Sequence, residues 1–147
     1  MFGKPSLVTR VATGKLVGFA IGLLGLLVMP WLWPDSGWME RIAFLLWYTT
    51  IGAFVGLAGV FTWHPVLRMP MPWWFSSSLI GAWMNLVLTL FIHDRLATMM
   101  IGLFGDQGAF RSPWWFVVEG ALAGLLIGYF ATRFGGEGPE TARDTGR

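Results

Sequence analysis

Hydrophobic residues fill the chain in four long runs, separated by shorter stretches that contain proline, glycine or charged residues. The apolar runs extend over about 16–33, 42–63, 73–92 and 114–132. The hydrocarbon core of a bilayer is about 30 Å thick and requires roughly 20 apolar residues in a helix. The pattern therefore predicts an all-α integral membrane protein, with residues 1–133 forming a single domain of four transmembrane helices.

Two segments outside the four runs have a different character. Residues 96–105 form an apolar patch that is too short to span a bilayer. We predict that this patch is a short interfacial segment before the fourth span, with an extension of the third helix as the alternative. Residues 134–147 are rich in glycine and charged residues and lack apolar periodicity, so they are predicted to form a disordered cytoplasmic tail.

Composition and charge support this assignment and orient it. Of 147 residues, 55% are hydrophobic and 12% are charged, whereas soluble domains carry about 25% charged residues. Cytoplasmic loops of membrane proteins carry an excess of Lys and Arg. With four spans, the termini and the second loop share one side and carry seven basic residues, against three on the other side. Both termini are therefore predicted to be cytoplasmic, and the pattern fits a multi-pass protein of a bacterial cytoplasmic membrane.

Glycines recur at helical spacing in three of the spans. Residues four apart share one helix face, and small residues there let two backbones approach closely in lipid. Such faces serve either packing within one bundle or docking of another subunit. The glycines concerned are Gly14, Gly18, Gly22 and Gly25 in the first span, Gly52, Gly56 and Gly59 in the second, and Gly120, Gly124 and Gly128 in the fourth.

The third span carries polar residues along one face. Polar side chains are costly against acyl chains, so this face is predicted to point into the bundle or toward a partner. Its polar members either hydrogen-bond neighbouring helices or line part of a path for an ion or small ligand. Asn85, near the middle of the span, is expected to form a hydrogen bond to another helix. The polar members are Ser78, Asn85, Thr89 and His93.

Glu119 is the only carboxylate within the four predicted spans. It follows Trp115 by four residues, which places it about 6 Å deeper along a helix. Its candidate partners are His93 and Arg95 at the end of the third span, and Arg111 before the fourth. Three roles compete: an ion pair that locks two spans together, a docking charge for another protein, and a proton or cation site in transport.

No sequence motif supplies a reaction, a metal site or a cofactor. The chain has no cysteine, Gly-rich phosphate loop, metalloprotease motif or nucleophile elbow. His64 and His93 lie at opposite ends of their spans, so one haem cannot join them within a chain. His64 either lies in the membrane interface or ligates a single porphyrin metal. No basic patch indicates nucleic-acid binding.

These observations predict a non-enzymatic accessory, scaffold or assembly subunit that contacts membrane lipids and either other membrane-protein subunits or copies of itself. The alternative is a small oligomeric transporter or channel that uses Glu119 and the polar face of the third span.

Overall fold

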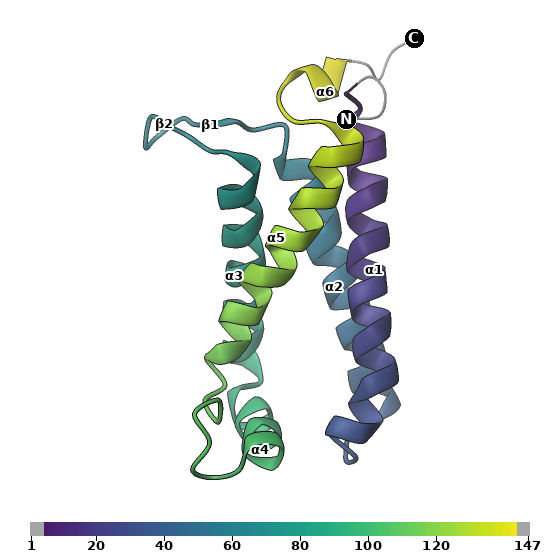
Figure 1. Cartoon of the computed structure of the whole chain (residues 1–147), viewed down its shortest axis with the longest axis vertical. Coiled ribbons are helices and arrows are strands. Elements are labelled where there is room, and N and C mark those ends of the chain that lie inside the picture. The colour runs from purple at the N-terminus through teal and green to yellow at the C-terminus, as the bar shows by residue number, and fades with distance from the viewer. Residues whose placement is uncertain (1–4, 144–147) are drawn as a thin grey trace.

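A computed structural model describes residues 5–143 and consists mainly of helices (Figure 1). Four helices are long and apolar enough to cross a membrane, as the sequence predicted, so the chain has the make-up of a multi-pass membrane protein. They are α1 (Leu7–Leu32), α2 (Trp38–Ala58), α3 (Trp73–Phe91) and α5 (Trp115–Gly135).

The helices differ from the predicted spans mainly at their ends. Helix α1 starts nine residues earlier than expected, at Leu7, because Ser6 caps it: the Ser6 Oγ accepts a hydrogen bond of 3.4 Å from the backbone N–H of Thr9. Helix α2 ends at Ala58 rather than near residue 63. The chain beyond it forms an antiparallel two-stranded ribbon from β1 (Trp63–His64) and β2 (Met69–Pro70), whose pairing takes these residues out of the helix.

The apolar segment between α3 and α5 is a separate helix, α4 (His93–Phe104). The backbone breaks at Ile92, with φ of −123° and ψ of 29°, so α3 does not continue through residues 96–105. Leu96 and Met100, four residues apart on α4, are buried. The alternative of a longer third helix is therefore wrong, while the placement of α4 in the membrane interface stays a prediction.

The prediction of a disordered tail is wrong for the first ten of its residues. Helix α5 continues to Gly135, and a short helix, α6 (Glu140–Arg143), follows it. The Gly138 N–H donates a hydrogen bond of 2.9 Å to the Gly59 carbonyl, and Thr141 is fully buried. These contacts satisfy backbone groups that would otherwise need water, which is why a glycine-rich sequence is ordered here. Residues 144–147 lie outside the described residues.

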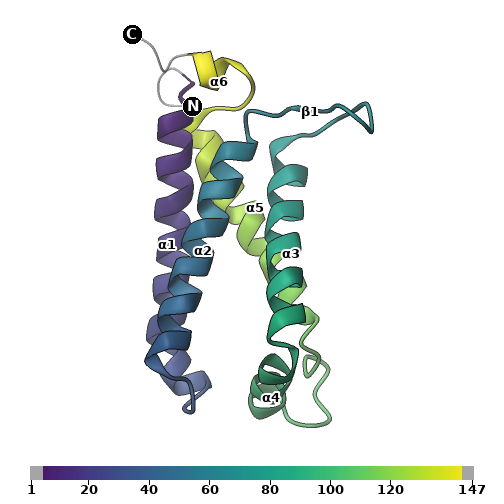
Figure 2. The ribbon, with the colours of Figure 1, turned by 180° about the vertical axis from the view of Figure 1, so that it is seen from behind.

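The long helices pack as two pairs, α1 with α2 and α3 with α5. Helix α5 is inclined, so that it runs from α3 at one end of the bundle to α1 at the other and contacts both (Figure 1). The Ser6 N–H donates to the Gly135 carbonyl at 2.9 Å, so the start of α1 meets the end of α5. Helices α2 and α3 contact each other much less, and seen from behind they stand apart (Figure 2). The buried core joins α2 and α5 through Tyr48, Ile51, Val55, Ala123 and Ile127.

Candidate functional site

Glu119 belongs to a polar cluster that links α2, α3 and α5. The Tyr48 hydroxyl, from α2, donates a hydrogen bond to Glu119 Oε2. Asn85 Nδ2, from α3, donates to the same oxygen at 2.9 Å. Both donors are buried: Tyr48 is 6% exposed and Asn85 is fully buried. The carboxylate is therefore held by two neutral donors from two other helices.

Asn85 is the centre of this cluster because each end of its amide has an interhelical partner. Besides Glu119, Nδ2 donates to the Phe116 carbonyl of α5 at 2.9 Å, and Oδ1 accepts a hydrogen bond of 3.1 Å from the Trp47 indole of α2. Asn85 was expected to form one hydrogen bond to another helix, and it forms such bonds with Glu119, Phe116 and Trp47. An unpaired amide in hydrocarbon costs several kcal/mol, which favours the single arrangement of helices that pairs it.

The partners predicted for Glu119 lie elsewhere, so the proposed ion pair is wrong. Arg95 forms an ion pair with Glu40, and its guanidinium lies 5.0 Å from the centre of the Trp33 ring. Arg111 donates to the Asp106 carbonyl at 2.6 Å. Because the backbone breaks at Ile92, Arg95 lies in the first turn of α4 and not on α3. There it pairs with Glu40, which lies in the first turn of α2.

His93 also lies away from Glu119, exposed at the start of α4, with its Nδ1 3.2 Å from Asp94 Oδ1. Among the described residues, therefore, none of the three predicted basic partners pairs with Glu119.

Sequence reasoning missed Tyr48 as the main partner of Glu119. A signal was available, because a tyrosine hydroxyl buried within a transmembrane helix needs a hydrogen-bond partner. The sequence shows that Tyr48 and Glu119 both lie in spans, but the helical face on which each lies depends on how α2 and α5 rotate against each other.

Glu119 also lines an apolar cavity of about 400 Å³. No hydrogen bond reaches its Oε1 from any residue between 5 and 143, and the Glu119 residue is exposed although Tyr48 and Asn85 are buried. The cavity lies between α1, α2, α4 and α5 and has almost entirely apolar walls. Its lining includes Leu24, Gly25, Val28 and Trp33 from α1 and its end, Phe44 and Tyr48 from α2, Met99 and Leu103 from α4, and Phe116 and Glu119 from α5.

The polar face of α3 is used mainly in packing within the bundle. Its buried members are Ser77, Gly81, Asn85 and Thr89, each four residues from the next, whereas Ser78 is only half-buried. The Thr89 hydroxyl bonds back to the Asn85 carbonyl of its own helix, at 2.7 Å. Ser77 packs against Gly128 of α5. Most of this face therefore serves helix packing, and Asn85 alone enters the cluster around Glu119.

Nine of the ten predicted glycines pack inside this chain. A methyl group added at Gly14, Gly18, Gly22, Gly52 or Gly56 would collide with backbone across the α1–α2 contact. The same substitution at Gly120, Gly124 or Gly128 would collide with α3, and at Gly59 it would meet the Arg10 guanidinium. Gly25 is the exception: nothing lies within 4 Å of an added Cβ, and the residue opens onto the cavity next to Glu119.

Arg10 is a structural centre that sequence reasoning missed, because it was counted only toward membrane orientation. Its side chain is fully buried, and Nε donates to the Gly56 carbonyl at 3.0 Å. Nη1 donates to Thr132 Oγ1 at 2.8 Å and to the Gly136 carbonyl. Gly56 and Gly136 lie at the carboxyl ends of α2 and α5, where helix dipoles place partial negative charge. Arg10 thus joins three helices at one end of the bundle.

Comparisons with known proteins add no information about this site. No protein family, curated protein or solved structure was found to match the chain. Between residues 5 and 143, no group of three or more His, Asp or Glu side chains is placed to hold a metal ion. The candidate site is therefore defined by one carboxylate, its two neutral donors and the apolar cavity beside them.

Proposed function

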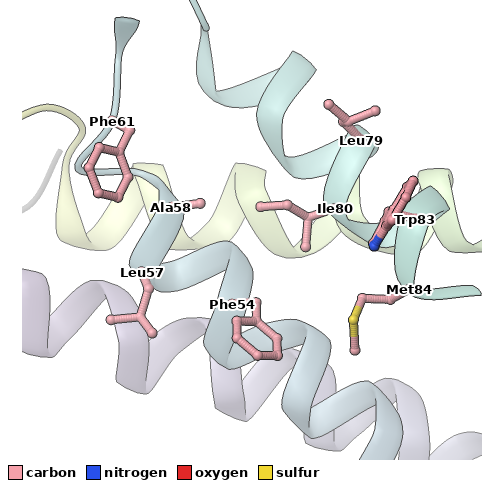
Figure 3. Close-up of a pocket in the computed structure, with 8 residues that line it drawn as sticks. All are labelled: Phe54, Leu57, Ala58, Phe61, Leu79, Ile80, Trp83 and Met84. Atoms are coloured by element: carbon pink, nitrogen blue, oxygen red, sulfur yellow. The ribbon is translucent and has the colours of Figure 1, made fainter. Parts of the chain in front are cut away.

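We propose that the protein is a non-enzymatic subunit of a membrane assembly, and that an apolar transmembrane helix of another subunit packs into the groove between α2 and α3. The observation behind this proposal is the groove itself, a space of about 750 Å³ with a wholly hydrophobic lining (Figure 3). Helix α2 and the residues after it supply Phe54, Leu57, Ala58 and Phe61, and α3 supplies Leu79, Ile80, Trp83 and Met84.

The groove exists because the close contacts of the bundle lie elsewhere. Glycine faces allow close packing of α1 on α2 and of α3 on α5, whereas α2 and α3 have few contacts with each other. The α2–α3 boundary has bulky side chains in place of glycines, and Phe54, Phe61 and Trp83 are 49%, 69% and 62% exposed. Helix association in lipid depends on packing contacts. A groove between two helices offers a docking helix more of these contacts than one convex helix face does.

The chemistry and the length of the groove favour an apolar helix as its occupant. A polar helix would leave its side chains unpaired against eight hydrophobic residues. A second cavity, of about 240 Å³, shares Ala58, Phe61, Leu79 and Ile80 with the groove and extends it to His64 of β1. The hydrophobic channel thus continues from the middle of α3 and the last turns of α2 to the loop between them, where part of a docked transmembrane helix can lie.

Transport is the second candidate function, and the Glu119 carboxylate beside a cavity is the observation that favours it. A transport path also needs polar groups across the rest of the bilayer. On the other side of Glu119, the contacts between α1 and α2 are close backbone contacts at Gly14 and Gly18. Assembly therefore accounts for more of the described residues than transport does.

The test combines purification with site-specific crosslinking. The protein is isolated from native membrane in a mild polymer, and every co-eluting protein is identified by mass spectrometry. A photo-crosslinking amino acid then replaces Met84 in the groove or, as a matched control, Leu122, which is 62% exposed on α5. We expect one co-purifying membrane protein to crosslink at position 84 and not at 122.

Two results decide against this assignment. Crosslinks between copies of this chain at position 84 would make it a homo-oligomer. Elution alone, with lipid as the only product at both positions, would refute the assembly function.

A further inference from the structure

We propose that the cavity beside Glu119 binds an amphiphilic amine, with its protonated amino group on the carboxylate and its hydrocarbon part between α1 and α4. This site and the proposed docking groove share no lining residue, so either proposal can fail without the other.

Only one oxygen of the Glu119 carboxylate, Oε1, is available to a ligand. Tyr48 and Asn85 fix Oε2, while Oε1 receives no hydrogen bond within residues 5–143. The two arginines that the sequence offered as partners are engaged elsewhere, Arg95 with the Glu40 carboxylate and Arg111 with the Asp106 backbone carbonyl. A carboxylate in apolar surroundings requires a compensating cation or a proton. An ammonium group supplies both the charge and a charge-assisted hydrogen bond to Oε1.

The walls of the cavity select an organic cation over a metal ion. A hard metal ion takes about six oxygen ligands, and here Glu119 supplies the only carboxylate. The remaining lining is hydrophobic, with Leu24 and Val28 on one side and Leu103 on the other. A volume of about 400 Å³ lies within the range of small-ligand sites, which combine apolar walls with a few fixed polar groups.

Gly25 leaves the cavity open because it has no side chain, and a larger residue at this position would fill it. Its neighbours in the glycine series of α1 pack against α2, but an added Cβ at position 25 meets nothing within 4 Å. Because Gly25 lines the cavity and its Cβ position is open, a leucine there is expected to fill part of the cavity. Gly102 of α4 has the same open surroundings but lies outside the cavity, so it is the matched control position.

The experiment uses the full chain in phosphatidylcholine nanodiscs with a dodecylamine that carries a photoreactive diazirine, alongside the corresponding dodecanol. Labelled peptides are identified by mass spectrometry. We expect the amine to label α1 and α4 residues that line the cavity. Glu119→Gln, whose amide oxygen still accepts from Tyr48 and Asn85, is expected to lower the affinity for the amine about tenfold, as the loss of a charged hydrogen bond implies.

The control variants separate a specific site from partition into the membrane. Gly25→Leu is expected to abolish labelling of the cavity by the amine, and Gly102→Leu to leave it unchanged. Equal labelling by amine and alcohol, or unchanged amine affinity in Glu119→Gln, would refute the proposal. Melting temperatures of all variants show whether a lost label reflects lost folding, and a folded Gly25→Leu that still labels would also overturn it.

Competition identifies the source of the amine. Displacement of the probe by phosphatidylethanolamine would assign the site to a lipid headgroup, and displacement only by unlabelled dodecylamine would assign it to a single-chain amine. Displacement by neither compound would show that labelling is not saturable, which contradicts a binding site.

Discussion

The clearest prediction concerns two glycines of α1 that the sequence does not distinguish. Gly22 and Gly25 lie within one turn of each other and in the same predicted glycine series. An added Cβ at Gly22 would lie 2.7 Å from the Leu45 carbonyl oxygen and 2.8 Å from the Leu45 Cα, whereas at Gly25 it would contact nothing. Gly22→Ala is therefore expected to destabilise the protein, and Gly25→Ala is not.

The size of the difference follows from the geometry. An ordinary contact begins at 3.4 Å, so the methyl at position 22 must move α1 from α2 by about 0.7 Å. A gap of that size removes about a quarter to a half of the dispersion energy of the atoms it separates. Overpacking of this kind costs about 1–3 kcal/mol. The gain in helix propensity from glycine to alanine, about 1 kcal/mol, applies to both variants and cancels in their difference.

The assay is reversible unfolding of the purified protein in mixed micelles, with the mole fraction of dodecyl sulfate as the denaturant and helical circular dichroism as the signal. Gly22→Ala should unfold at a lower fraction than the parent, and Gly25→Ala at an equal or higher one. If the two variants have the same midpoint, the close α1–α2 contact at Gly22 is refuted.

Three further predictions use the same unfolding assay. Asn85→Leu removes hydrogen bonds to Trp47, Phe116 and Glu119, each worth about 0.6 kcal/mol in a membrane protein, and should lower the free energy of unfolding by about 2 kcal/mol. A loss under about 0.5 kcal/mol would contradict the cluster. Arg10→Lys should lower the free energy of unfolding by about 1–3 kcal/mol, because one ammonium group cannot bond the acceptors on both α2 and α5 that the guanidinium joins. Stability equal to that of the parent would show that Arg10 is not a structural centre. Glu40→Gln should change stability by less than about 1 kcal/mol at any salt concentration, since its ion pair is partly exposed, and a larger effect would show that this pair fastens the bundle.

The sequence alone was sufficient to predict the four long helices. Four apolar runs of transmembrane length, such as 73–92, correspond closely to helices in the structure. This succeeds because a backbone in hydrocarbon must satisfy its own hydrogen bonds, so an apolar run of this length has one favourable conformation. Helix ends were less predictable where a contact from elsewhere in the chain is involved, as at Gly135, the last residue of α5, whose carbonyl accepts a hydrogen bond from the Ser6 N–H.

The tertiary structure alone decided which residues meet. Glu119 was recognisable as an unusual carboxylate, but its partners Tyr48 and Asn85 come from two other helices, and the expected Arg95 pairs with Glu40. Gly22 and Gly25 look alike in the sequence, yet one is pressed against α2 and the other opens a cavity. Sequence position gives a residue's depth along its helix, because the helical rise is fixed. The rotation and spacing of each helix depend on the packing of all its neighbours at once, so the faces that meet are properties of the assembled bundle.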